Sequence, residues 1–150
     1  MKLKGKDIVC VSFPNWEGEY MKTIVQIMTV LGKNNRVFYV DYAFTWKDIL
    51  FYLLGKRDLH LKRVLGFSSR LRKEMIGENQ FVYVFTPPPV FPINWINNPK
   101  THTLFSKINS AIIGRSIQKS LKKTGITEPI VINAFNPVSY THLTLPTTPY

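Results

Sequence analysis

The sequence predicts an α/β protein with a parallel sheet and helices on both faces of that sheet. Two observations predict this class. Short apolar runs of strand length recur along the chain, and the segments between them carry apolar residues at helical spacing. Continuous apolar runs are typical of strands buried on both faces, as strands are in parallel sheets. The runs are residues 7–12, 36–40, 81–85 and 129–134.

The first forty residues predict a strand, a loop, a helix and a second strand. Residues 7–12 form the first strand, and the string Phe-Pro-Asn-Trp-Glu-Gly at 13–18 breaks it. Gly32 suits the end of the helix that follows, and the second strand, 36–40, ends at Asp41-Tyr42. The helix is indicated by regularly spaced apolar residues: Met21, Ile24, Val25, Met28 and Leu31. Such a unit generates a right-handed crossover between parallel strands.

The remaining elements continue this alternation. Thr45 is a suitable cap for a helix over 46–54, whereas residues 55–79 fit no clear element. The third strand, 81–85, must end at Thr86-Pro87-Pro88-Pro89, because proline cannot donate to a sheet ladder. A long helix is expected over 103–123 and a fourth strand over 129–134. The buried stripe of the long helix is predicted to be Phe105, Ile108, Ile112, Ile113, Ile117 and Leu121. The pattern is that of an incomplete Rossmann-like parallel sheet.

Composition narrows the function classes. The 150 residues fit one domain, and 20 Lys and Arg against 9 Asp and Glu give a net charge of +11. This excess indicates an anionic partner, which could be nucleic acid, acidic headgroups or a phosphorylated substrate. Cys10 is the only cysteine, so no internal disulfide can form. We find neither a secretory leader nor an apolar run long enough to span a membrane, so we expect a cytoplasmic protein.

The end of the chain reads differently from the rest. Residues 138–147 (Val-Ser-Tyr-Thr-His-Leu-Thr-Leu-Pro-Thr) resemble a translated sequencing adapter. We therefore expect a domain over 1–137 and a non-native tail over 138–150, and set the tail aside before reasoning about the fold.

Sequence motifs for nucleotides, metals and nucleophiles are missing. The chain has no Walker-type loop, no G-x-G-x-x-G after the first strand and no G-x-S-x-G elbow. One cysteine and the scattered histidines His60, His102 and His142 do not predict a zinc site. We expect no metal and no bound cofactor.

The candidate site is therefore inferred from its position in the predicted fold. Ligands of open parallel sheets bind beyond the carboxyl ends of the strands. Gly18 would let the backbone approach a ligand, and Trp16 offers a flat face to a sugar ring. Glu17 or Glu19 could accept a proton, although acidic residues at a helix start also simply complement its dipole. The predicted lining is Asn15, Trp16, Glu17, Gly18, Asp41, Tyr42, Pro87, Asn133 and Asn136.

The basic and aromatic segment over 46–73 is the second candidate. Its side chains could lie on an anionic membrane surface, and they could also bind nucleic acid, although no nucleic-acid motif is present. A solvated basic face is the simplest interpretation, followed by the membrane and then by nucleic acid. The candidates for facing a membrane are Trp46, Lys56, Arg57, Lys62, Arg63 and Arg70.

Several strings together resemble the opening of a bacterial glycosyltransferase. They are residues 7–12, 14–18, 37–42, 86–89 and 132–137, in that order along the chain. The order is similar to that of the two-domain GT-B enzymes called glycosyltransferase family 1 or family 4. The resemblance covers roughly residues 6–137.

The resemblance implies two facing Rossmann-like domains, of which this chain would be the N-terminal, acceptor-side one. The loop at 13–19 would lie at the cleft, and a nucleotide-sugar would be the co-substrate without a bound metal. The acceptor would be a glycan or a lipid-linked molecule at the inner membrane face, and the chain alone is expected to be inactive. A non-enzymatic basic module that binds anionic membrane or nucleic acid is the alternative, and another Rossmann-like enzyme with a nucleotide cofactor is a further one.

Overall fold

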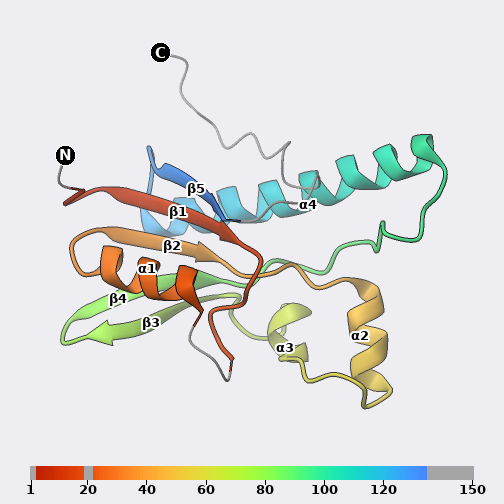
Figure 1. Cartoon of the computed structure of the whole chain (residues 1–150), viewed down its shortest axis with the longest axis horizontal. Coiled ribbons are helices and arrows are strands. Elements are labelled where there is room, and N and C mark those ends of the chain that lie inside the picture. Colours follow the sequence, from red (N-terminus) through yellow and green to blue (C-terminus); the bar gives the residue numbers. More distant parts are fainter. Residues whose placement is uncertain (1–2, 19–21, 135–150) are drawn as a thin grey trace.

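The protein has a five-stranded mixed sheet between helices (Figure 1). The computed structural model describes residues 3–18 and 22–134. The strands are β1 (Asp7–Ser12), β2 (Arg36–Val40), β3 (Leu71–Gly77), β4 (Gln80–Phe85) and β5 (Ile130–Ala134). Their order is β3-β4-β2-β1-β5. The predicted α/β class and the four predicted strands are confirmed.

The prediction of a purely parallel sheet was wrong at one edge. β1 pairs in parallel with β2 and β5, and β2 pairs in parallel with β4. β3 runs antiparallel to β4 and comes from the segment that fitted no element. A tight turn joins the two strands, and Asn79 in that turn has a φ of 57°, which asparagine tolerates better than most residues.

One face of the sheet is covered by α1 (Thr23–Gly32). Val25 and Met28 of this helix are buried against alternate residues of three strands, among them Cys10, Tyr39 and Val84. Gly32 fits where the helix passes close to β3 and β4, because a Cβ there would lie 2.8 Å from atoms of Ile76 and Val82. Burial raises the pKa of the Cys10 thiol to about 12, so this cysteine is a packing residue.

The opposite face is covered by α4 (Pro99–Thr124). Ile113, Ile117 and Leu121 pack on the β-strand residues Val9, Phe38, Val40 and Phe85. Helices on both faces of the sheet are thus confirmed. The N-terminal half of α4 extends beyond the sheet (Figure 1), so the predicted stripe is too long there: Ile108 is 36% exposed. The helix ends at Gly125, whose φ of 70° is a left-handed conformation that suits glycine.

Two short helices lie beyond the carboxyl ends of β1 and β2 (Figure 1). They are α2 (Trp46–Leu53) and α3 (Leu61–Val64). Thr45 caps α2 as predicted, and it forms a reciprocal capping box with Asp48. Within the described ranges, none of the helices has the length and apolar character needed to cross a membrane. The tail at 138–150, Asn136 and Glu19 lie outside the described residues.

Candidate functional site at the carboxyl end of the sheet

A pocket of about 490 Å³ lies beyond the carboxyl ends of β1, β2 and β4. The loop after β1 contributes Asn15, Glu17 and Gly18, and the two other strands are followed by Asp41 and Thr86. The opposite wall comes from α3 and the segment before it. That wall includes Asp58, Leu59, His60, Arg63 and Val64. The site therefore forms where parallel α/β sheets generally bind their ligands.

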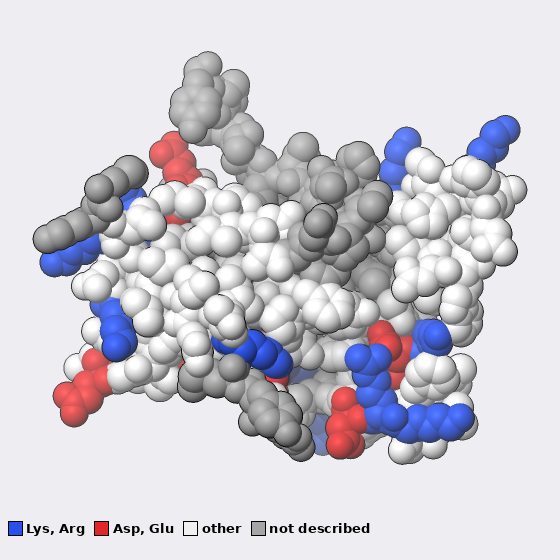
Figure 2. All heavy atoms as spheres, in the orientation of Figure 1, with Lys and Arg blue, Asp and Glu red and all other residues white. Residues whose placement is uncertain are grey.

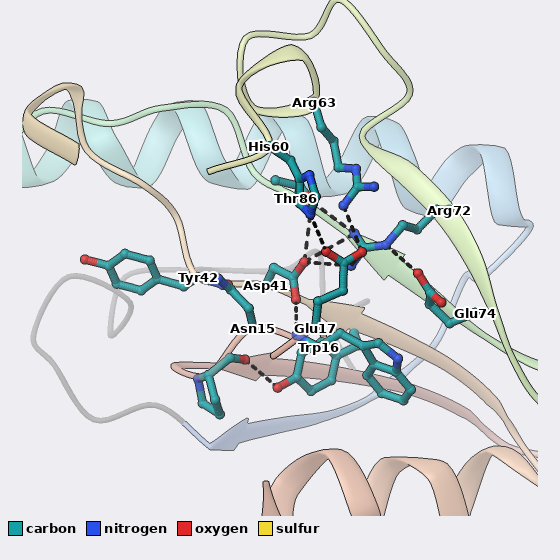
Figure 3. Close-up of polar contacts among 12 residues, drawn as sticks. Asn15, Trp16, Glu17, Asp41, Tyr42, His60, Arg63, Arg72, Glu74 and Thr86 are labelled. Carbon is teal, nitrogen blue, oxygen red and sulfur yellow. Dashed lines mark hydrogen bonds and ion pairs between the residues drawn. The ribbon is translucent and has the colours of Figure 1, made fainter. Parts of the chain in front are cut away.

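Asp41 is the buried anchor of the site (Figure 3). One carboxylate oxygen accepts the Trp16 backbone N–H at 2.7 Å, and the other lies 3.3 Å from the Arg72 guanidinium and 3.4 Å from the Thr86 hydroxyl. Burial raises the pKa of Asp41, and the Trp16 N–H and Arg72 oppose that rise. With both oxygens occupied, Asp41 positions the loop rather than facing a ligand.

Glu17 is surrounded by three cationic or basic groups (Figure 3). Its carboxylate lies 2.9 Å from His60 Nε2, 3.1 Å from Arg63 Nη1 and 3.3 Å from Arg72 Nη2. Partial burial would raise the pKa of Glu17, but Arg72, Arg63 and His60 together hold it below its ordinary value. Glu17 is therefore a carboxylate at neutral pH and a weak base by itself.

Arg72 connects the carboxylates of the site. Its guanidinium contacts Asp41 and Glu17, and its Nε donates to Glu74 at 2.6 Å. The Arg72 side chain is only 13% exposed, so these contacts hold it in a fixed position. Arg72 lies on β3, which places this edge strand in direct support of the pocket.

The loop after β1 is held by hydrogen bonds between side chains and the backbone. Asn15 Oδ1 accepts the Tyr42 N–H at 3.0 Å, and Lys22 Nζ donates to the carbonyl oxygens of Asn15 and Glu17. Gly18 has a φ of 150°, and a Cβ there would lie 2.9 Å from Lys22 Nζ. The glycine thus permits the turn that presents Glu17 to the pocket.

His60 and Glu17 form the one carboxylate–imidazole pair among the described residues. If Nε2–H donates to Glu17, Nδ1 of the neutral ring is left as a proton acceptor. The His60 side chain is 71% exposed and lines the pocket, so a hydroxyl group bound there could reach it. This arrangement can accept a proton from a bound alcohol.

The remaining described residues of the predicted site do not line the pocket. Trp16 packs edge-on against Tyr39 with ring centres 5.1 Å apart, and it does not line the pocket. Tyr42 faces a neighbouring groove, Pro87 is buried, and Asn133 lies on the edge strand β5.

The neighbouring groove has an aromatic lining and a volume of about 360 Å³. Residues 42–45 form its boundary with the first pocket, which contains Asp41 and Phe44. Lys47 Nζ lies 3.7 Å from the centre of the Trp95 ring at its rim. The aromatic rings in its lining are those of Phe13, Tyr42, Phe51, Phe91 and Trp95.

The residues predicted to face a membrane divide into two groups. Trp46, Lys56 and Lys62 are exposed, and Arg57 pairs with Asp48 at the surface. Arg63 and Arg70 are only partly exposed, and Arg63 contacts Glu17. Figure 2 shows Lys and Arg side chains spread over this face, with acidic side chains among them near α2 and α3, rather than one continuous basic patch.

Sequence reasoning missed His60, Arg72 and Thr86 as site residues. His60 and Arg72 come from the unassigned segment 55–79, where no local pattern marks them as neighbours of Glu17. Thr86 follows β4 directly, so the rule that selected Asp41 would also have found it.

Comparisons with protein-family models, with curated proteins and with solved structures found no match. Within residues 3–18 and 22–134, no group of three or more His, Cys, Asp or Glu side chains is placed to hold a metal ion.

Proposed function

We propose that this chain is the acceptor-side domain of a GT-B-type glycosyltransferase, which transfers a sugar from a nucleotide-sugar to an acceptor hydroxyl. The observation that supports this most is the Glu17–His60 pair in a pocket at the carboxyl ends of three parallel strands. Its position agrees with the cleft loop that the sequence resemblance implies. The donor-binding domain would be supplied by a further segment of the protein.

In this proposal His60 is the base and Glu17 is its partner. Nδ1 of His60 takes the proton of the acceptor hydroxyl while the acceptor oxygen bonds to the sugar carbon, and the bond from that carbon to the nucleotide phosphate breaks. Glu17 fixes the imidazole and stabilises the imidazolium that forms. Arg63 and Arg72 hold Glu17 in place through contacts of 3.1 and 3.3 Å.

The aromatic groove suits the apolar part of an acceptor. It adjoins the polar pocket through residues 42–45, so one amphipathic molecule can occupy both hollows. Aromatic walls bind apolar chains and sugar faces, whereas the polar pocket would take the hydroxyl-bearing end. This division favours a lipid-linked acceptor over an unsubstituted glycan.

The test is a sugar-transfer assay on the product of the complete gene with a panel of labelled nucleotide-sugars. Replacing the base, His60→Gln, is expected to lower kcat by about 10²- to 10⁴-fold. His102→Gln on α4, outside the pocket, is the matched control and is expected to keep full activity. Full activity of His60→Gln would reject the proposed base, and no transfer by the wild type from any donor would reject the proposed function.

A second candidate, a module that binds anionic membrane, is favoured by the outer face of α2. Leu50, Leu53 and Leu54 are 55%, 68% and 58% exposed there, with Trp46 and Lys56 nearby in the chain. Apolar side chains beside basic ones suit a headgroup layer. Flotation with anionic vesicles should be weakened in Leu53→Ser and unchanged in Leu104→Ser, which alters a leucine on α4 that is 56% exposed. Flotation that does not depend on anionic lipid would contradict this candidate.

A further inference from the structure

A third hollow, of about 390 Å³, lies between the loop that precedes β3 and the C-terminal half of α4. The loop contributes Ser68, Ser69 and Arg70, and the helix contributes Ser116 and Ser120. Two lysines of the same helix, Lys119 and Lys123, complete its polar lining. Among the residues that the structure describes, no acidic side chain lines this hollow, and none lines both it and the pocket around Glu17.

Arg70 is the unusual residue of this hollow. Its Nη2 donates to the Val64 carbonyl oxygen at 3.0 Å, but its Nε is buried with no hydrogen-bond partner among the described residues. Arg63 and Arg72 each contact a carboxylate, whereas Arg70 has none within the described part of the chain. Burial without such a partner lowers the pKa of Arg70.

The local charge is therefore positive and uncompensated. A partly buried guanidinium without a counter-charge is costly, and an anion beside it would remove much of that cost. The carboxyl end of α4 adds a dipole equivalent to about half a negative charge, which three cations exceed. Serine hydroxyls and a guanidinium fork are suited to a tetrahedral anion with several acceptor oxygens.

We propose that the hollow formed by Arg70, Lys119, Lys123 and the four serines binds a phosphate group, in addition to the function proposed above. Arg70 and the two lysines supply the charge, and Ser68, Ser116 and Ser120 donate hydrogen bonds to the remaining oxygens, whereas the Ser69 hydroxyl already donates to the Leu71 carbonyl oxygen at 2.7 Å. This site does not depend on the Glu17–His60 pair.

The test is a titration of the full chain with inorganic phosphate at constant ionic strength. Binding is monitored by thermal unfolding and by NMR. Wild-type Tm is expected to rise with the phosphate concentration, because a ligand bound only to the folded state stabilises it, and the NMR shifts of residues around the hollow are expected to saturate. Arg70→Gln and Lys119→Gln should each raise the Kd about tenfold. Lys107→Gln, on α4 but outside the hollow, should bind like the wild type.

NMR shifts that do not saturate, or a rise in Tm equal to that in chloride, would overturn the proposal. Equal phosphate affinity in the wild type and in Lys119→Gln would also overturn it. Lys119 is exposed, so this variant should keep its fold even if Arg70→Gln does not.

A sedimentation experiment with lipid vesicles identifies the source of the phosphate group. Phe67 lines the hollow and is 82% exposed, so it could enter a bilayer above a bound headgroup. Sedimentation with phosphatidic acid vesicles that is lost in Phe67→Ser, with phosphate affinity kept, supports the site and identifies a lipid headgroup. Phosphate binding without sedimentation supports the site and identifies a soluble phosphate ester.

Discussion

Asp41 is the residue on which the loop after β1 depends most. It is 4% exposed and accepts hydrogen bonds from the Trp16 backbone, the Arg72 guanidinium and the Thr86 hydroxyl. Asp41→Ala leaves the Trp16 N–H and the Thr86 hydroxyl without this acceptor, whereas Arg72 keeps Glu17 and Glu74 as partners. We expect a loss of about 3 kcal/mol in the free energy of unfolding, measured by chemical denaturation. Asp58→Ala, at an exposed acidic residue of the same pocket, should change it by less than about 0.5 kcal/mol.

The lowered pKa of Glu17 predicts that the free energy of unfolding depends on pH. Its pKa is lower in the folded chain than in the unfolded chain, so its stabilising contribution is complete above the unfolded value and is lost as the pH falls through the folded value. The stability difference between wild type and Glu17→Gln should therefore shrink on acidification below about pH 4. Asp41 has the opposite sign, because its pKa is raised by folding. Urea denaturation of both proteins at several pH values checks this, and a difference that grows on acidification would contradict it.

At this scale the sequence located part of the site. Asn15, Glu17, Gly18 and Asp41 were predicted because they follow strands, and all four line or anchor the pocket. His60 was not predicted, because its contact with Glu17 joins residues far apart in the chain. Such contacts depend on how the chain returns to the sheet, and no local periodicity encodes that path.

The element α2 provides a test of helix capping. Thr45 Oγ1 accepts the Asp48 N–H at 3.3 Å, and Asp48 Oδ2 accepts the Thr45 N–H at 2.7 Å. Thr45→Ala should lower the free energy of unfolding by about 1 kcal/mol. Thr23→Ala changes an exposed threonine at the start of α1, where no side-chain cap is present, and should be close to neutral. Equal losses in the two variants would show that the capping box is not the cause.

The element α1 approaches the sheet closely at Gly32. A Cβ at residue 32 would lie 2.8 Å from both Ile76 Cδ1 and Val82 Cγ2. Gly32→Ala should therefore cost about 1–3 kcal/mol in stability, despite the better helix propensity of alanine. Adding Ile76→Val removes one of the clashing atoms and should recover part of the loss in a double-mutant cycle. A stabilised Gly32→Ala variant would contradict this packing.

The elements missed by sequence reasoning are those with mixed polarity. β3 contains Arg72, Lys73 and Glu74 in succession, so its pattern does not resemble that of a buried strand. These charges are accommodated because Arg72 turns toward Asp41 while Lys73 lies over the ring of Phe81. Gly77 at the end of β3 and Asn79 in the turn after it were the available signal for a hairpin.

At the scale of the whole molecule, the parallel strands and the two covering helices were predictable because burial on both faces leaves continuous apolar runs. The antiparallel edge strand β3 was not predictable, because an edge strand has to satisfy fewer packing constraints. At the other edge, Ile130 and Val131 of β5 are 39% and 46% exposed.

We propose that this chain is the acceptor-side part of a two-domain glycosyltransferase. The most direct measurement is a single long read of the source gene through and beyond codon 137. If the proposal is right, the reading frame continues there into a second parallel α/β domain, in place of residues 138–147. A read that confirms Val138–Tyr150 and then a stop codon would contradict it, and the membrane-binding module would become the leading proposal.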